Sequence, residues 1–475
     1  MRLQSPQVQL GVLFAYGLLV VAVVEFLTPC VMTLLDERKT HVYVDTWREQ
    51  VVICVAGVLG ILATNLLGPR ILLLLGTTTG TLLSAAMAAA AHGVRGGHAV
   101  FLAAKVADDV GHTMTRVCLV TMALTYPCER KKARVLALFQ FVLDMFVTLG
   151  EVLRQNHGAG HSGRAQALSA VWARLAFTGV SAVCALWVTP LGAVVRDSGV
   201  FVIAREAKSV RREVGKTWKL FGNKYMLLLM PYLFSFPFAL GIMGMSFPNR
   251  QSVLLYNAGA LLALVLAFVL DAGSEWRRRR GQLGFALVTF VTAVCLSAMT
   301  VLNTRPVDER ALPALAGHPG LPVNAYRLLA YAPLFYATVF FNGMSISCVF
   351  LFSGWVIGSL TNDAEYTARF SGALLSVPAL GTLAAYLSLG TDDWRPHVPA
   401  NSPLFVGIAL LAFSSLAMYY VVHSISDTNN WSLMRMKNAP RSAPCSEANA
   451  GRSCVVRFAD DSSVESSSIA KHPMR

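Results

Sequence analysis

Long apolar segments alternate with short polar ones along most of the chain. The apolar segments are mostly about 17–25 residues long, which is the length that an α-helix needs to cross the hydrocarbon core of a bilayer. They cover residues 8–34, 51–68, 71–92, 98–125, 134–154, 168–192, 225–246, 252–271, 281–302, 326–350, 366–389 and 403–424. The pattern predicts an all-α, multi-pass integral membrane protein with about twelve transmembrane helices.

The polar segments between these spans predict the orientation. The chain is 55% hydrophobic, only 14% charged, and has a net charge of +14. With the N-terminus inside, the densest basic clusters, at 130–134, 196–224 and 277–280, all fall on one side of the membrane. Cytoplasmic loops carry an excess of Lys and Arg, so we predict that this side is cytoplasmic and that both termini lie there. The positive charge then reflects membrane topology, and no nucleic-acid partner is expected.

The basic segment after the sixth span divides the chain into two groups of six spans. Such a division is typical of transporters that are built from two repeated halves. We therefore predict an N-terminal six-helix bundle at 1–192, a basic cytoplasmic linker at 193–224 and a C-terminal six-helix bundle at 225–426. Residues 427–475 are rich in Ser, Asn, Pro and Arg. Because such a segment cannot bury an apolar core, we predict a disordered cytoplasmic tail.

The linker allows two interpretations. Its Lys and Arg residues recur at spacings of three and four between residues 198 and 219. This spacing fits an amphipathic helix that lies on the anionic inner leaflet of the membrane. It fits equally well an unstructured hinge whose charges only fix the topology.

Enzyme chemistry has no recognisable signature in the sequence. The nine cysteines lie mostly in apolar runs and form no CxxC pair, which argues against a disulfide framework or a metal site. No Ser-His-Asp set or phosphate-binding loop is present, because the glycine-rich stretch 76–80 falls inside a predicted span. We therefore expect no catalytic residue, no metal and no cofactor, and we do not predict an enzyme.

Charged residues inside the predicted spans are the main candidates for function. Each costs about 2.5–3.5 kcal/mol at the centre of a membrane helix on insertion scales. In the fourth span Lys105, Asp109, His112 and Arg116 fall within about 60° of one another around the helix, beside Asp108. The candidate proton or substrate path consists of Glu25, Asp109, His112, Arg116 and Asp144.

Two roles for these charges remain open. In a transport path Glu25 or Asp109 would titrate, and Arg116 would attract an anion or neutralise a carboxylate. Alternatively, the charges form a structural ion-pair network that clamps the first, fourth and fifth helices together. In that case Lys105 simply extends to the outer membrane surface.

A set of motifs resembles a known family. The stretch after the fourth span contains Tyr126, Pro127, Glu129, Lys132, Arg134, Ala137, Phe139, Gly150 and Asn156. Other motifs are Leu67-Gly68-Pro69-Arg70, Leu270-Asp271 with Arg277–Arg280, and Gly358–Asp363 with Ala368, Arg369 and Gly372. Together they resemble the UNC-ninety-three-like branch of the major facilitator superfamily over most of residues 5–425.

The resemblance implies two six-helix bundles around a central cavity that helices one, four, seven and ten line. It implies a secondary transporter of a small molecule or ion, with proton coupling as an option. The alternative is a non-transporting regulator or trafficking escort of a channel or receptor, which would bind a membrane-protein partner. Charged turns of the two halves can pair at the cytoplasmic end in this family, and the candidate gate here is Arg70, Glu129, Arg134, Asp271 and Arg277.

Overall fold

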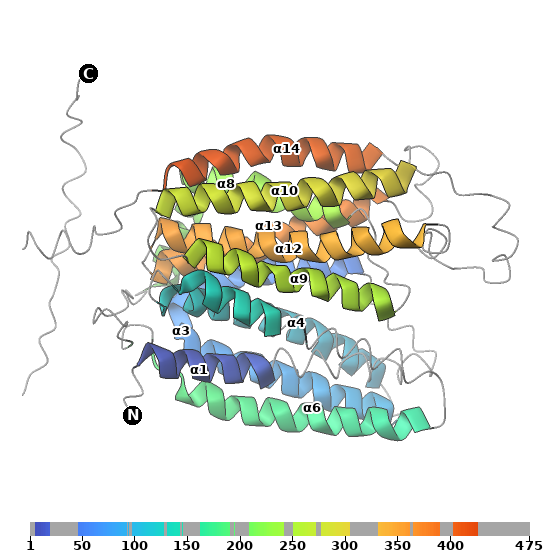
Figure 1. Ribbon diagram of the computed structural model, residues 1–475. Coiled ribbons are helices and arrows are strands. Elements are labelled where there is room, and N and C mark those ends of the chain that lie inside the picture. Colours follow the sequence, from blue (N-terminus) through green and yellow to red (C-terminus); the bar gives the residue numbers. More distant parts are fainter. Residues whose placement is uncertain are drawn as a thin grey trace, which may run out of the picture. The chain divides into compact units, whose positions relative to one another are not determined.

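The structure is a computed structural model. It describes residues 5–19, 46–92, 94, 97–127, 131–142, 145, 162–190, 194, 209–241, 250–271, 277–304, 331–361, 364–389 and 402–425. All of these residues belong to one compact unit, Met1–Asp427, and Thr428–Arg475 form a second unit. Every regular element among the described residues is a helix (Figure 1). The prediction of an all-α protein is confirmed for this part of the chain.

Most of the helices coincide with predicted spans. They are α1 (Pro6–Gly17), α3 (Thr46–Ala91), α4 (Gly97–Thr125), α6 (Ser162–Trp187), α7 (Val210–Phe221), α8 (Lys224–Gly241), α9 (Arg250–Asp271), α10 (Arg277–Thr304), α12 (Ala332–Leu360), α13 (Ala364–Leu389) and α14 (Ser402–His423). Residues 132–142, in the predicted fifth span, are also helical. The helix α7 lies within the predicted linker and follows Ser209, whose hydroxyl accepts a hydrogen bond from the Arg212 backbone N–H at 3.3 Å.

The predicted second and third spans meet at a sharp kink inside α3. Gly68 has a φ of 76° and a ψ of 168°, in the left-handed range that residues with a Cβ rarely adopt. Pro69 follows and lacks a backbone N–H, so it cannot donate a hydrogen bond within the helix. The two residues together therefore separate two apolar helical segments without a long loop.

Seven of the described helices are long and apolar enough to cross a membrane, by length and composition. They are α3, α6, α9, α10, α12, α13 and α14. The helix α8 has a shorter apolar part, Lys224–Leu240, and α4 carries the charged residues described above. A multi-pass membrane protein is thus supported, while the number twelve stays a prediction.

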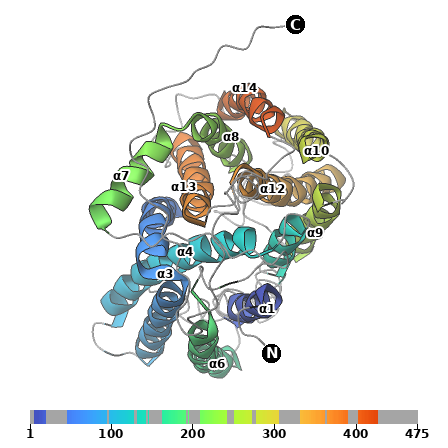
Figure 2. The ribbon, with the colours of Figure 1, turned by 90° about the vertical axis from the view of Figure 1, so that its left-hand side faces the viewer.

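The helices α4 and α12 lie at the middle of the bundle, as the end-on view in Figure 2 shows. On the α4 side are α1, α3 and α6, and on the α12 side are α8, α9, α10, α13 and α14. Buried residues occur along α12 from Phe335 to Ser359, and the helix continues to Leu360, beyond the predicted end at residue 350. A helix that is buried on all sides belongs at the centre of a bundle.

The helix α13 joins the two groups because it packs against both α3 and α8. At Gly372 a Cβ atom would lie only 2.1 Å from Cγ1 of Ile61 on α3 and 2.8 Å from the Gly57 carbonyl oxygen. Only a residue without a side chain allows the two helices to approach so closely. The contact connects the predicted N-terminal and C-terminal halves.

Candidate functional site

The charged stripe on α4 is held mainly by a pair within the helix. Lys105 Nζ contacts Asp109 Oδ1 one turn away, and it lies 3.9 Å from Glu49 Oε1 at the start of α3. The Asp109 side chain is only 11% exposed. Lys105 therefore neutralises Asp109 locally, although the sequence had suggested Arg116 as a cation for a carboxylate.

His112 and Arg116 continue the same stripe and are both half-buried. Among the described residues, Arg116 forms no hydrogen bond or ion pair. The other two members of the candidate path, Glu25 and Asp144, lie outside the described residues. The described part of the path is thus a neutral Lys–Asp pair followed by a half-buried guanidinium.

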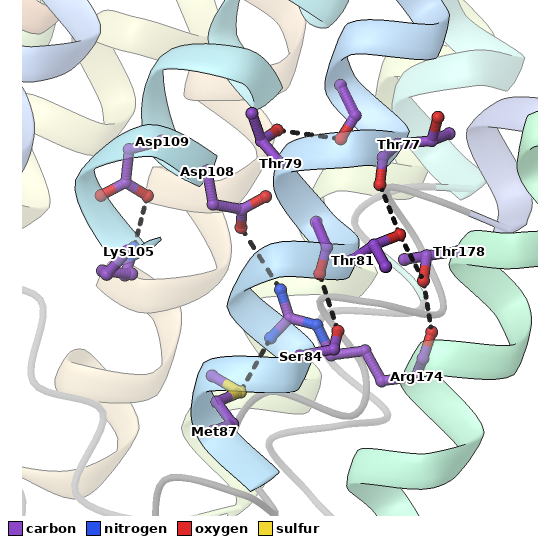
Figure 3. Close-up of polar contacts among 12 residues, drawn as sticks. Thr77, Thr79, Thr81, Ser84, Met87, Lys105, Asp108, Asp109, Arg174 and Thr178 are labelled. Carbon is purple, nitrogen blue, oxygen red and sulfur yellow. Dashed lines mark hydrogen bonds and ion pairs between the residues drawn. The ribbon is translucent and has the colours of Figure 1, made fainter. Parts of the chain in front are cut away.

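A second ion pair on α4 was not anticipated from the sequence. Asp108 Oδ2 accepts a hydrogen bond at 3.3 Å from Nη2 of Arg174 on α6, and Nη1 of Arg174 lies 3.4 Å from Met87 Sδ on α3 (Figure 3). The Arg174 side chain is only 1% exposed. Its signal in the sequence was the isolated arginine within the predicted sixth span, which is costly in lipid unless paired.

Residues with hydroxyl groups lie near this ion pair on α3 and α6 (Figure 3). Thr81 and Thr178 lie 3.5 Å apart across α3 and α6 (Figure 3). The Ser84 hydroxyl donates to the Gly80 carbonyl at 2.7 Å, as is usual for Ser and Thr within membrane helices. Polar contacts therefore join α4 to α6 through the ion pair and α3 to α6 through the two hydroxyl groups.

The candidate gate centres on Asp271, at the end of α9. Its fully buried carboxylate accepts hydrogen bonds from the backbone N–H groups of Ala133, at 3.2 Å, and Arg134, at 2.8 Å. Arg134 Nε also donates to it at 3.3 Å, and the Arg134 guanidinium lies over the Phe268 ring. Asp271 thus caps the start of helix 132–142, where N–H groups and the helix dipole favour a negative charge.

A lysine makes a second contact beside this cap. Lys132 is almost completely buried and donates from Nζ to the Gly358 carbonyl oxygen near the end of α12, at 2.7 Å. Of the other candidate gate residues, Arg277 is buried, Arg70 is exposed and Glu129 lies outside the described residues. The structure therefore brings Arg134 and Asp271 together and leaves Arg70 on the surface.

A further ionic cluster joins three elements at the linker helix. Glu213 of α7 accepts three hydrogen bonds of 2.7–2.9 Å from Arg369 of α13, and both side chains are almost fully buried. Asn65 of α3 donates to the same carboxylate at 2.6 Å. Glu365 of α13 accepts from Arg369 at 3.2 Å and from Lys216 of α7 at 3.0 Å.

This cluster is electrically balanced, since two carboxylates face two cations. The contact between Arg369 and Glu213 is bidentate and charge-assisted, which is the strong form of such hydrogen bonds. In the sequence Arg369 stands only within a motif, and nothing singles out Glu213 among the residues of the basic linker. Only the fold shows that the two are partners, 156 residues apart in the sequence.

Comparison with known proteins places these features in context. No family model matches the chain. The sequence is 23% identical to UNC93-like protein 1 of Arabidopsis thaliana over 401 residues, which cover 79% of this chain and 82% of the relative. It is 21% identical to an UNC93-like protein of Schizosaccharomyces pombe, over 68% of this chain and 64% of that protein.

Solved structures share the fold. The human organic anion transporter MFSD10 matches with a TM-score of 0.54 at 15% identity, covering 87% of this chain and 99% of its own. The Escherichia coli fucose:proton symporter FucP matches with a TM-score of 0.54 at 12% identity, covering 88% of this chain and 98% of its own. The proton:xylose symporter XylE matches with a TM-score of 0.52 at 13% identity, covering 88% of this chain and 96% of its own. The chain therefore has the fold of major facilitator superfamily transporters, and its resemblance to the UNC93-like branch of that superfamily is confirmed.

Proposed function

We propose that the chain is a secondary transporter that moves a small solute across a membrane by alternating access. The observation that carries this proposal is the pair of ionic contacts at one end of the bundle. Asp271 holds the start of helix 132–142, and Arg369 holds Glu213. Both contacts connect the predicted N-terminal half or the linker to the predicted C-terminal half.

Polar contacts of this kind suit an end of the bundle that opens and closes repeatedly. A buried ion pair adds little stability over well-packed apolar side chains, because desolvation offsets its attraction. Water can replace its hydrogen bonds when the two halves separate, whereas separated apolar surfaces gain nothing from water. We infer that these contacts hold the cytoplasmic end closed while the opposite end admits the solute.

The α4 stripe supplies the proposed path. Asp109 and Lys105 neutralise each other, so protonation of Asp109 would free the ammonium group. Arg116 offers a cation to an anionic solute or to a carboxylate. The proposed proton or substrate path consists of Glu25, Asp109, His112, Arg116 and Asp144, and Lys105 is the partner of Asp109.

The test begins with a metabolite screen by thermal shift on purified protein. A transported solute should stabilise the folded protein by RT ln(1 + L/Kd), an amount that rises with the solute concentration L, by mass action. With that solute, Glu25→Gln or Asp109→Asn should abolish coupled uptake into proteoliposomes while the protein content stays equal. Uptake that is unchanged in both variants would overturn the assignment of coupling to these carboxylates.

The second candidate is a non-transporting regulator or escort of another membrane protein. The motif Gly68-Pro69-Arg70 favours this candidate. Arg70 is exposed and forms no ion pair with any described residue, whereas Asp271 in the second half is paired with Arg134. A regulator should co-purify stoichiometrically with its membrane-protein partner. A transporter should instead show stabilisation by its solute without a partner.

A further inference from the structure

The linker helix α7 presents three distinct faces. At about 100° per residue, Glu213, Thr217 and Leu220 fall on one face, and all three are buried. This face carries the contacts of Glu213 with Asn65 of α3 and with Arg369 of α13. It therefore attaches α7 to the ends of two predicted membrane-spanning helices.

The adjacent face is apolar and exposed. Val210, Val214 and Trp218 follow one another at intervals of four residues and are 61%, 46% and 78% exposed. Phe221 lies on the same side and packs its ring against Trp218, with 6.3 Å between the ring centroids. Large side chains of this kind, in a continuous stripe, indicate an interaction surface.

The third face is basic. Arg211, Arg212 and Lys219 are exposed, and none forms an ion pair with a described residue. The only acidic residue of α7 is Glu213, which points into the protein. The exposed surface of the helix is thus apolar on one side and purely cationic on the other, which is the composition of helices that lie in a membrane interface.

The position of α7 fits this composition. Its buried face contacts α3 three residues before the kink at Gly68, and Lys216 contacts Glu365 in the first turn of α13. The helix α7 therefore lies at the level where these predicted spans end. Figure 2 shows α7 at the rim of the bundle, beside α3 and α13. A helix at this level and on the rim meets the lipid headgroups.

We propose that the exposed surface of α7 binds the membrane, with Val210, Val214 and Trp218 in the interface and the basic residues on anionic phospholipid headgroups. The same helix carries Glu213, which is bonded to Arg369. The face proposed to bind the membrane and the residue that bonds Arg369 therefore belong to the same helix.

The first test measures how deeply the apolar and the basic face of α7 lie in the membrane. Full-length protein without its native cysteines receives a fluorescent thiol label at Trp218→Cys or, as a matched control, at Gly215→Cys. A side chain at Gly215 would point into open space. In phosphatidylcholine vesicles that contain phosphatidylserine, brominated lipid should quench the label at position 218, and aqueous iodide should quench the one at position 215. Equal iodide quenching at both positions would overturn the proposal and favour a protein partner for this face.

The second test concerns the headgroup charge. Removal of phosphatidylserine should reduce lipid quenching of the label at position 218 several-fold. Arg211→Gln with Lys219→Gln should remove this dependence, whereas Arg279→Gln, on exposed Arg279 of α10, should keep it. Equal quenching with and without phosphatidylserine, or equal loss in the Arg279 control, would overturn the role of the α7 cations. Both leaflets of such vesicles have the same lipids, and iodide is supplied at equal concentration inside and outside, so neither test depends on the predicted topology.

Discussion

Replacement of Asp271 by Asn should open the end of the bundle that this residue closes. The carboxylate is fully buried and accepts hydrogen bonds from Ala133 N–H, Arg134 N–H and Arg134 Nε at 2.8–3.3 Å. An amide keeps one acceptor oxygen and turns an NH₂ group toward these donors. Each lost charge-assisted hydrogen bond is worth about 1.5–3 kcal/mol, and a lost helix cap costs about 0.5–2 kcal/mol.

Two effects limit the total free-energy cost of the substitution. The Arg134 side chain is 45% exposed, so water can solvate its guanidinium once the partner is neutral. Removal of a buried charge also removes its desolvation cost. We therefore expect a net shift of about 2–3 kcal/mol toward the open end. Since about 1.4 kcal/mol is a tenfold change, the open population should rise about 30- to 150-fold.

The assay is the rate of thiol labelling at Ser359→Cys, in a background without other reactive cysteines. Ser359 is 4% exposed near the end of α12, next to the Gly358 carbonyl that Lys132 contacts. A permeant maleimide reaches this position only when the end opens, so its rate reports the open population. Glu49→Gln, which removes a carboxylate from the start of α3, is the matched control. An unchanged rate in Asp271→Asn, or an equal rise in the control, would refute a closing role for Asp271.

Three other predictions concern the ion pair of α4, the packing of α13 and the orientation of α7. Arg174→Met should lower the stability of the purified protein by about 3–5 kcal/mol, because Asp108, whose side chain is only 14% exposed, loses this cation. Addition of Asp108→Asn should recover part of the loss in thermal unfolding, and strictly additive losses would argue against the pair. Gly372→Val should also speed the maleimide labelling, since its Cβ would overlap Ile61, and a slower rate would contradict this. A cysteine at Gly215 should react with an impermeant reagent only after the membrane is opened, and labelling from outside would reverse the predicted topology.

The sequence alone determined the helical character of the protein. In lipid every backbone N–H and C=O group must be bonded within its own segment, so a long apolar run can only be a helix. The bounds of α4 and α13 therefore lie within a few residues of the predicted spans 98–125 and 366–389. The Lys105–Asp109 contact could also be predicted from the sequence, because residues four apart share a helix face.

Only the tertiary structure decided which charges are partners. Asp108 with Arg174, Arg134 with Asp271, and Glu213 with Arg369 are separated by 66, 137 and 156 residues. A helical pattern gives the direction of a side chain around its own axis but not the helix that it faces. Many cations were available to each carboxylate along the chain. Only the packing of α4 with α6, of helix 132–142 with α9 and of α7 with α13 selects one. The reason is that a buried charge is tolerated only where the fold supplies its counter-charge at hydrogen-bond distance.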